Sequence, residues 1–494
     1  MSDSQSGPDR YDVAIIGTGF SGLAVAINLR RLGMDNFVLL ERADAVGGTW
    51  RDNVYPGCAV DVPSVLYSYS FAPNPDWTRL YATQPELRAY TESVVDRFDL
   101  RQRIQLKSEV AEADFDEDAA EWVIRLTDDR IVRARAVVMG YFSLHAAAIP
   151  DIPGRSGFTG PQMHSSTWDP GFDPAGKRIA VVGAGASAVQ IVPALARTAG
   201  RVISFQRTAA WVLPRGDRAI PPAVRTLLRR IPPLRLAARA FVFSFLEALH
   251  FAEFHPRLVR LYARVCLAAL NRQVPDPEVR RKLVPDYSFG CKRPMVSDEY
   301  YAAFARPEVG LSTEKIVEIT PTGLRTADGL HHEVDAIVWA TGFHVQDSIA
   351  HFPDFRTETT STRKKFTQDG FTAYRGIAFA GLPNLFAVTG PNTALPHTSQ
   401  FLAIEPTAGL IARTIADMHH RAVTRYTPTA AAEQAWVARA RRLLSTRIWS
   451  TGNCTSYFVD QTGTNTLTYP GGTWTLRRDR RQLRLEDWQQ AGGR

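Results

Sequence analysis

The chain has 494 residues, of which 45% are hydrophobic and 22% are charged, and its formal net charge is +8. This length allows two or three domains with sizeable cores, and the composition is that of a soluble globular protein. The modest positive charge suits anionic ligands such as dinucleotides. We expect no nucleic-acid partner, because no basic run is interleaved with aromatic residues as single-strand binding requires.

Four cysteines are scattered along the chain without C-x-x-C spacing: Cys58, Cys266, Cys291 and Cys454. This pattern predicts neither a disulfide framework nor a metal site, and it favours a reducing, cytoplasmic location. Residues 1–10 are polar and lack the apolar segment of a signal peptide, so we predict a disordered tail. Residues 237–254 are the most apolar stretch, but their charged residues argue against a transmembrane segment.

A first glycine-rich turn follows the apolar strand predicted over residues 11–16. Gly17 permits the tight turn, Gly19 allows a pyrophosphate to approach the backbone, and Gly22 allows helix and strand to pack closely. The next predicted strand, residues 36–40, ends on Glu41, which is placed to bind a ribose diol. The pattern therefore predicts a dinucleotide site that includes Phe20 in the turn.

A second turn follows a strand predicted over residues 177–182 and has the G-x-G-x-x-A form. Its members are Gly183, Gly185, Ser187 and Ala188. The strand predicted over residues 202–205 leads into Gln206-Arg207-Thr208, where no acid stands. Arg207 offers a planar cationic group for a 2′-phosphate, with Thr208 beside it, which favours NADPH over NADH. The alternative is a solvated arginine at a strand end.

Residues 158–169, FTGPQMHSSTWD, lie just before this second turn and fit the pattern F-x-G-x-x-x-H-x-x-x-W-[P/D]. The matching residues are Phe158, Gly160, His164, Trp168 and Asp169. The pattern resembles the fingerprint of type I Baeyer–Villiger monooxygenases, flavoenzymes that insert oxygen beside a ketone carbonyl. The resemblance implies that His164 and Trp168 couple domain rotation to the state of the cofactor.

Further segments resemble the same family. The G-G-T-W turn implies that Gly48, Thr49 and Trp50 lie along FAD, and the A-T-G turn implies that Thr341 and Gly342 bind cofactor. In the P-G-x-x-x-D stretch, Asp61 is expected beside the flavin, paired with a catalytic arginine. The C-K-R-P stretch supplies that arginine as Arg293, with Lys292 on the NADP phosphate. The turn Val138-Met139-Gly140-Tyr141 departs from the A-T-G-like form of relatives.

The implied fold is α/β, with two Rossmann-like dinucleotide-binding domains and an inserted helical subdomain. We expect an FAD-binding domain over residues 11–150 and 376–494, and an NADP-binding domain over residues 151–213 and 287–375. Residues 214–286 form the insertion. Its apolar helices are expected to roof the substrate cavity, and contact with an anionic membrane is the less favoured alternative.

The resemblance implies an FAD-containing, NADPH- and O₂-dependent enzyme that converts a ketone to an ester or lactone through a C4a-peroxyflavin. Arg293 would stabilise the anionic oxygen, and Asp61 would orient Arg293. No metal and no obligatory protein partner are expected. Two alternatives remain: oxidation of N or S heteroatoms, against which Trp168 argues because that sister family typically carries tyrosine there, and a non-catalytic FAD- and NADPH-binding protein.

Overall fold

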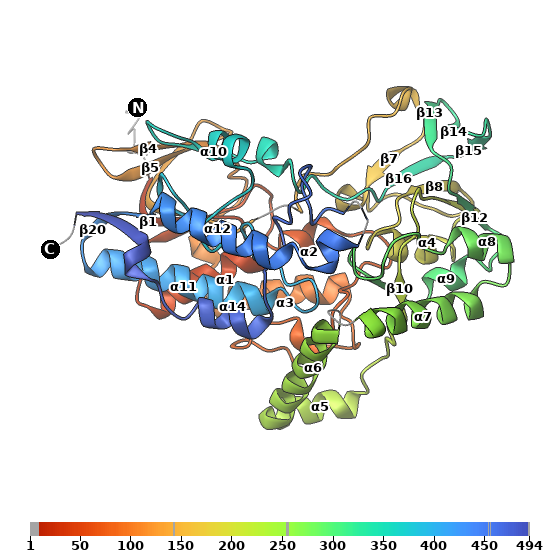
Figure 1. Cartoon of the computed structure of the whole chain (residues 1–494), viewed down its shortest axis with the longest axis horizontal. Coiled ribbons are helices and arrows are strands. Elements are labelled where there is room, and N and C mark those ends of the chain that lie inside the picture. Colours follow the sequence, from red (N-terminus) through yellow and green to blue (C-terminus); the bar gives the residue numbers. More distant parts are fainter. Residues whose placement is uncertain (1–8, 142–143, 253–255, 453, 455, 493–494) are drawn as a thin grey trace, which may run out of the picture.

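The computed structural model describes residues 9–141, 144–252, 256–452, 454 and 456–492. Two α/β units lie side by side, each around its own sheet, and a pair of helices projects below them (Figure 1). The tail predicted over residues 1–10 falls outside the described residues as far as residue 8. Asp9 and Arg10 belong to the first strand, which therefore begins two residues earlier than that prediction allows.

The first unit is built around a nine-stranded sheet. Its strands come from two parts of the chain, because the chain leaves for the second unit and later returns. The path of seven strands runs β17 (Asp354–Arg356), β4 (Val110–Asp116), β5 (Glu121–Leu126), β6 (Ile131–Met139), β1 (Asp9–Ile16), β2 (Phe37–Leu40) and β3 (Ile104–Gln105). Off this path, β19 (Leu382–Ala387) pairs with β6, and β18 (Ala378–Phe379) pairs with β19. The return begins at β17, earlier than the expected boundary at residue 376.

Helices from both ends of the chain cover the first sheet. Here α1 (Phe20–Arg31) packs against α11 (Phe401–His420), and both are buried along most of their length. The other helices of this unit are α2 (Thr49–Asp52), α3 (Gln84–Arg97), α10 (Thr362–Asp369), α12 (Ala430–Leu444), α13 (Ile448–Thr451) and α14 (Thr473–Asp479). A small antiparallel pair, β20 (Val423–Pro428) and β21 (Trp488–Gly492), lies next to the C-terminus.

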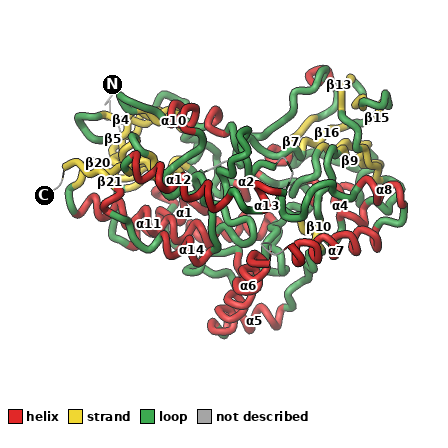
Figure 2. The backbone as a smooth tube through the Cα atoms, viewed as in Figure 1, coloured by secondary structure: helices red, strands yellow, loops and turns green. Residues whose placement is uncertain are grey.

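The second unit has a five-stranded parallel sheet. Its order is β12 (Val309–Ser312), β9 (Arg201–Phe205), β8 (Arg178–Val182), β16 (Ala336–Trp339) and β7 (Gln162–His164). Beside it are the helices α4 (Ala188–Leu195) and α9 (Tyr300–Ala303), the antiparallel strands β13 (Ile316–Thr320), β14 (Gly323–Thr326) and β15 (His331–Glu333), and the pair β10 (Val212–Leu213) and β11 (Met295–Val296). Figure 2 shows these strands grouped apart from the first sheet.

Four helices interrupt the second unit. They are α5 (Pro222–Arg230), α6 (Pro232–Ala252), α7 (Pro256–Gln273) and α8 (Pro277–Lys282). Each begins with proline, whose fixed φ suits the first helical position and whose missing N–H is not needed there. Among the described residues, no helix combines the length and apolar character needed to cross a membrane.

Local chemistry explains why several elements begin where they do. Thr83 and Glu86 form a reciprocal capping box at the start of α3, and the Thr429 hydroxyl accepts a hydrogen bond from the Ala432 N–H at the start of α12. Such caps satisfy backbone donors that the helix leaves without partners. The five-stranded parallel sheet, the parallel strands β3, β2, β1, β6 and β19 of the mixed nine-stranded sheet, and the glycine turns confirm the predicted α/β class.

Gly160 provides a test of how the fingerprint segment is packed. A Cβ at this position would meet the Asp335 carbonyl oxygen at 2.3 Å, whereas one at Gly157 would meet nothing within 4 Å. We expect Gly160→Ala to lower the free energy of unfolding by about 1–3 kcal/mol, as overpacking does. Gly157→Ala is the matched control and should change it little. Chemical denaturation measures both, and equal effects would contradict this account of the packing.

Candidate active site

A cavity of about 1740 Å³ runs between the two units. Residues following β1, β8 and β16 line it, so these parallel strands of the two sheets turn their carboxyl ends toward it. Ligands of open α/β sheets bind at this edge. The volume exceeds the roughly 300–1,000 Å³ of a typical small-molecule pocket, which leaves room for more than one ligand.

The half of the cavity that belongs to the first unit is centred on Glu41. Its carboxylate accepts hydrogen bonds from the Thr18 N–H at 3.0 Å and from Arg51 Nη1 at 2.7 Å. Burial raises the pKa of Glu41, but Arg51 and the Thr18 hydrogen bonds outweigh that effect and hold it below its usual value. The side chain is therefore a fixed anionic acceptor at the end of β2.

The glycines of the two turns divide into packing and ligand positions. A Cβ at Gly22 would meet the Gly17 carbonyl oxygen at 2.0 Å, and one at Gly183, where φ is +128°, would meet the Ala340 oxygen at 2.2 Å. At Gly185 a Cβ would meet nothing within 4 Å. Since Gly185 also lines the cavity, the space beside it fits the backbone approach that a pyrophosphate requires.

Two cations lie in the half of the cavity that belongs to the second unit. Lys292 and Arg207 both line it, and Lys292 Nζ lies 4.7 Å from the centre of the Tyr287 ring. Burial lowers the pKa of Lys292, Asp286 opposes this effect, and the charge of Arg207 adds to the lowering. Two positive side chains whose charges interact beside an open cavity form a suitable site for a phosphate dianion.

Arg293 and Asp61 meet across the cavity. Arg293 Nη2 and Nε donate to the same Asp61 Oδ2, at 2.7 and 3.1 Å, and Nη1 donates to the Pro396 carbonyl oxygen at 3.2 Å. Asp61 is the main cause of a raised Arg293 pKa, so the guanidinium stays charged. A guanidinium has five N–H groups, so these contacts with described residues leave two for a ligand.

The fingerprint segment lies between the units rather than on the cavity wall. His164 ends β7, and its Nε2 lies 2.9 Å from the Gly342 carbonyl oxygen of the A-T-G turn. The short helix Ser165–Thr167 that follows contacts α2 of the first unit. Phe158 and Trp168 are buried, and exposed Asp169 accepts a hydrogen bond from the Gly171 N–H at 2.8 Å.

Gln190, on α4, forms a contact between the units that the sequence did not reveal. Its side chain donates to the Ala59 carbonyl oxygen at 3.0 Å and accepts from the Ala59 N–H at 3.3 Å and the Tyr55 hydroxyl at 3.2 Å. This backbone belongs to the P-G-x-x-x-D stretch that leads to Asp61. A lone glutamine on a helix carries no signal for such a contact, since its partners lie more than a hundred residues away.

A disulfide joins Cys291 to Cys454, which corrects the prediction that the cysteines would not pair. Cys291 directly precedes Lys292, and Cys454 belongs to the C-terminal segment that brings Tyr457 and Phe458 to the cavity. The pairing joins positions 163 residues apart, so no local spacing could have indicated it. Cys58 and Cys266 are free and buried.

The inserted helices do not line the cavity, contrary to the expected roof. None of the described residues 214–252 and 256–286 belongs to its wall, whereas the loop of residues 389–400 contributes six. The insertion supports this loop from behind: Glu247 on α6 lies 2.8 Å from His397 Nε2 and also accepts from the Thr473 hydroxyl. His250 stacks on the His397 ring, 3.8 Å between centres.

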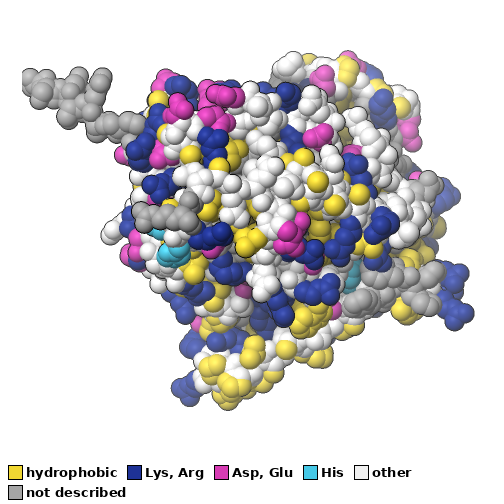
Figure 3. Space-filling view, turned by 60° about the vertical axis from the view of Figure 1, so that its left-hand side comes forward, with side chains coloured by type: hydrophobic (Ala, Val, Ile, Leu, Met, Phe, Trp, Pro, Cys, Tyr) yellow, Lys and Arg dark blue, Asp and Glu magenta, His cyan; other side chains and the backbone are white. Residues whose placement is uncertain are grey.

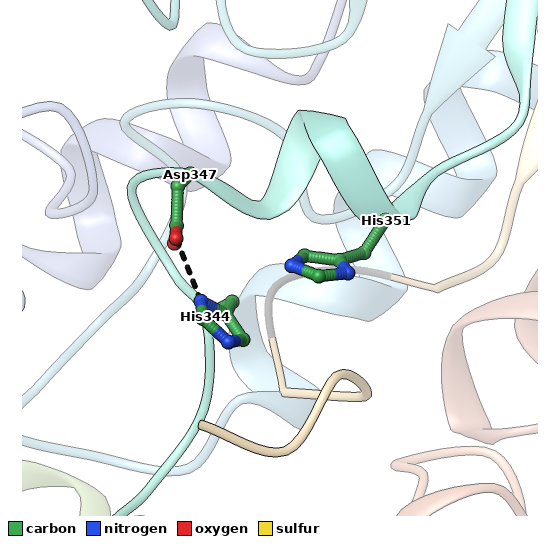
Figure 4. Close-up of side chains that lie close together, drawn as sticks. All are labelled: His344, Asp347 and His351. Carbon is green, nitrogen blue, oxygen red and sulfur yellow. Dashed lines mark hydrogen bonds and ion pairs between the residues drawn. The ribbon is translucent and has the colours of Figure 1, made fainter. Parts of the chain in front are cut away.

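His344, Asp347 and His351 gather at the rim of the cavity, and their possible ligand atoms lie within 4.8 Å of one another (Figure 4). The sequence offers no metal motif here. His344 Nδ1 lies 2.6 Å from Asp347 Oδ2, and Asp347 and His351 are exposed. A hydrogen-bonded surface pair accounts for this arrangement, so we assign no metal to it.

Most sequence-predicted site residues line the one cavity. Those that do are Gly17, Gly19, Phe20, Glu41, Gly48, Thr49, Trp50, Asp61, Gly183, Gly185, Ser187, Arg207, Thr208, Lys292, Arg293, Thr341 and Gly342. Gly22, Ala188 and the fingerprint residues are not among the residues that line it. The turn at residues 138–141 lacks the A-T-G sequence but keeps a glycine that close packing requires. A Cβ at Gly140 would meet Gly22 Cα at 2.8 Å.

Comparisons with known proteins agree with this geometry. Residues 10–248 match the family model described as flavin-binding monooxygenase-like. A Baeyer–Villiger monooxygenase of Streptomyces coelicolor is 40% identical, over 99% of this chain and 94% of its own length. The crystal structure of OTEMO in complex with FAD and NADP superposes with a TM-score of 0.88 at 26% identity, covering 98% of this chain and all of that one.

A second solved structure is similar to the same degree. Cyclohexanone monooxygenase from Rhodococcus sp. Phi1, bound to NADP⁺, has a TM-score of 0.88 at 27% identity and covers 99% of this chain and all of its own. The similarity to these proteins therefore extends over both α/β units and the insertion between them.

His145, on the cavity wall, predicts a pH dependence of stability. Burial lowers its pKa from 6.5 to about 4. Between these values the unfolded chain binds a proton that the folded protein does not, so stability falls as pH drops through this window. We expect His145→Gln to flatten the fall of Tm with pH, whereas His420→Gln, at the exposed end of α11, should leave the profile unchanged. Thermal unfolding across this pH range measures both, and coincident wild-type and His145→Gln profiles would refute the assignment.

Proposed function

Because this chain belongs to the Baeyer–Villiger monooxygenases, we propose that Arg293 and Asp61 form the reaction centre of its FAD-, NADPH- and O₂-dependent oxidation of a ketone. The enzyme is a flavoprotein monooxygenase that yields an ester or lactone. The observation that carries the assignment of the centre is the contact of 2.7 Å between Arg293 and Asp61, which come from different units and meet over the same cavity.

Bound FAD, once reduced by NADPH, supplies the chemistry that activates O₂. The contribution of the chain is charge, position and exclusion of water. Arg293 supplies a fixed positive charge next to the reacting atoms, and such a charge stabilises the negative oxygen that develops when a carbonyl is attacked. Asp61 holds the guanidinium in one orientation through two hydrogen bonds. Apolar side chains of Phe343, Phe458 and Leu467 on the same wall limit water.

The two halves of the cavity correspond to the two dinucleotides. The turn at Gly17 and the anionic acceptor Glu41 suit the FAD adenosine diphosphate, with Gly48, Thr49 and Trp50 along its length. The turn at Gly183 suits NADPH, with its 2′-phosphate between Arg207 and Lys292. We accordingly propose an FAD-binding domain and an NADP-binding domain, the former regained at β17, and residues 214–286 as an insertion.

We propose that the fingerprint segment couples the positions of the two domains. His164 holds the A-T-G turn at Gly342, and the helix after it touches α2, so a shift of either unit moves the segment. This role is one of positioning, since none of its residues lines the cavity.

The partners we propose are a ketone and O₂, and the location we propose is the cytoplasm, where NADPH is supplied. The Cys291–Cys454 disulfide counts against this location, because a reducing compartment keeps structural cysteines as thiols. Counting free thiols in protein from intact cells tests it: four free thiols would support the cytoplasm, and two would contradict it. The decisive test of function is a product screen of aliphatic, cyclic, aryl and steroidal ketones with NADPH and O₂, in which amines and sulfides represent the heteroatom alternative. Oxygenation of amines or sulfides alone would overturn the proposal, as would a protein that binds both cofactors and yields no product.

Arg207 should decide the preference for NADPH. Loss of a charge-assisted contact costs about 1.5–3 kcal/mol, so Arg207→Ala should raise the KM for NADPH roughly ten- to a hundredfold while NADH use barely changes. Lys292→Ala should act in the same direction. Arg42→Ala is the matched control, since Arg42 lines the other half of the cavity. Steady-state kinetics with both reductants measures the ratio, and equal losses with NADPH and NADH would remove Arg207 from the phosphate site.

Arg293 should separate oxygen insertion from cofactor reduction. We expect Arg293→Ala to consume NADPH and O₂ but to release hydrogen peroxide in place of ester or lactone, since only the second step needs its charge. Arg293→Lys keeps a charge without the planar group and should rescue poorly. The matched control is Arg215→Ala, because Arg215 stacks on Tyr81 and donates to the Val60 carbonyl oxygen next to Asp61. An unchanged ratio of product to NADPH consumed would rule Arg293 out.

A further inference from the structure

The helices α5 and α6 leave large apolar side chains in water. They project away from both sheets (Figure 1), and α5 has no buried residue. We call the exposed set the apolar tip; it consists of Val224, Leu227, Ile231, Leu234, Leu236, Phe241 and Phe245. Phe241 is 73% exposed, Leu236 69% and Phe245 53%. Single exposed apolar residues are ordinary, but a contiguous set on two successive helices marks an interaction surface.

One face of α6 packs on the core through Val242, Phe243 and Leu246, yet its opposite face is apolar as well. Leu234, Phe241 and Phe245 recur at intervals of seven and four residues and so share one exposed face. Two charged side chains of α6 point inward: Arg239 Nη1 donates to the Val65 carbonyl oxygen at 2.9 Å, and buried Glu247 accepts from the Thr473 hydroxyl. A helix that buries charged side chains and exposes Phe241 and Phe245 fits an apolar medium around its outer face.

The charged side chains of α5, and those of α6 before Glu247, are all positive. Between Asp217 and Glu247 the chain has six arginines and no acidic residue. One of them, Arg229, pairs with Asp76 of the first unit, while Arg230 is exposed beside Ile231. Figure 3 shows apolar side chains at the lower end of the molecule, with dark blue side chains beside them. Arginines that flank an apolar face bind anionic lipid headgroups while the apolar groups enter the interface.

A neighbouring helix adds an aromatic group of the kind that prefers a membrane interface. Trp474 on α14 is 60% exposed, and its ring lies 5.2 Å from that of Phe243 on α6. Tryptophan is enriched where one end of a side chain meets apolar chains and the other meets water. No described helix can span a membrane. The binding mode that fits is therefore one in which α5 and α6 lie on the membrane surface.

We propose that the apolar tip docks this enzyme on the surface of an anionic phospholipid bilayer. A second copy of the chain is the poorer occupant, because a symmetric contact would bring two arginine-rich tips together. The structure thereby reverses the order of the two alternatives that the sequence allowed for the insertion. The proposal does not depend on the reaction, since none of these residues lines the cavity.

Co-sedimentation of the flavin-loaded enzyme with vesicles tests the proposal. The enzyme should sediment with vesicles of phosphatidylcholine mixed with phosphatidylglycerol, less with phosphatidylcholine alone, and less with the mixture at high salt. Replacing two exposed phenylalanines (Phe241→Ser with Phe245→Ser) should weaken binding to the mixture at least about tenfold. Arg225→Gln with Arg230→Gln should remove the preference for the anionic vesicles.

Leu330→Ser is the matched control, because Leu330 is 57% exposed in the hairpin between β14 and β15, in the second unit. It should bind the vesicles as the wild type does, and all variants should reduce FAD with NADPH at the wild-type rate. Failure of the wild type to bind the anionic vesicles would overturn the proposal, as would unchanged binding by the phenylalanine variant. A dimer that this variant converts to a monomer would assign the face to a second copy instead.

Discussion

The contact between Arg293 and Asp61 is the constraint on which the architecture depends. Each residue stands on a segment of a different unit, and the two are brought to 2.7 Å only when both sheets turn their carboxyl ends toward one cavity. The positive charge of Arg293 is stabilised here because the Asp61 carboxylate beside it is also held in place. The aspartate keeps the arginine ionised, and the arginine keeps an acid at the cavity wall from standing alone in a partly apolar site.

A continuous chain of contacts connects this pair to the outside of the molecule. Arg293 donates to the Pro396 carbonyl oxygen, the neighbouring His397 contacts Glu247, and Glu247 belongs to α6. The insertion thus braces the loop that positions the arginine, although it contributes nothing to the cavity wall. Its inner face contacts the core and buries Glu247, while its outer face exposes large apolar side chains.

What the sequence could predict follows from how local each feature is. The glycine turns and the acid at the end of β2 are short patterns with a direct physical reason. They predict the presence of both sheets and most of the residues that line the cavity. Arg293 and Asp61 lie 232 positions apart, so only the resemblance to a family could pair them. The disulfide and the contacts of Gln190 had no such guide. The insertion was misjudged because amphipathic helices look alike in sequence whether their apolar face meets protein or another medium.

The disulfide also determines how the two units can move apart. The backbone passes between them where Ala147 and Phe343 form a bridge, and the link from Cys291 to Cys454 ties the segment that carries Arg293 to the C-terminal part of the chain. The disulfide is covalent, whereas the bridge consists of backbone hydrogen bonds. Gln346, three residues after Phe343, donates to the carbonyl oxygen of Tyr457, three residues after Cys454. The contact of Gln190 with Ala59 and Tyr55 consists of hydrogen bonds alone. We therefore expect the two units to separate first at the Gln190 contact, because the opposite edge of the cavity is held by a covalent bond.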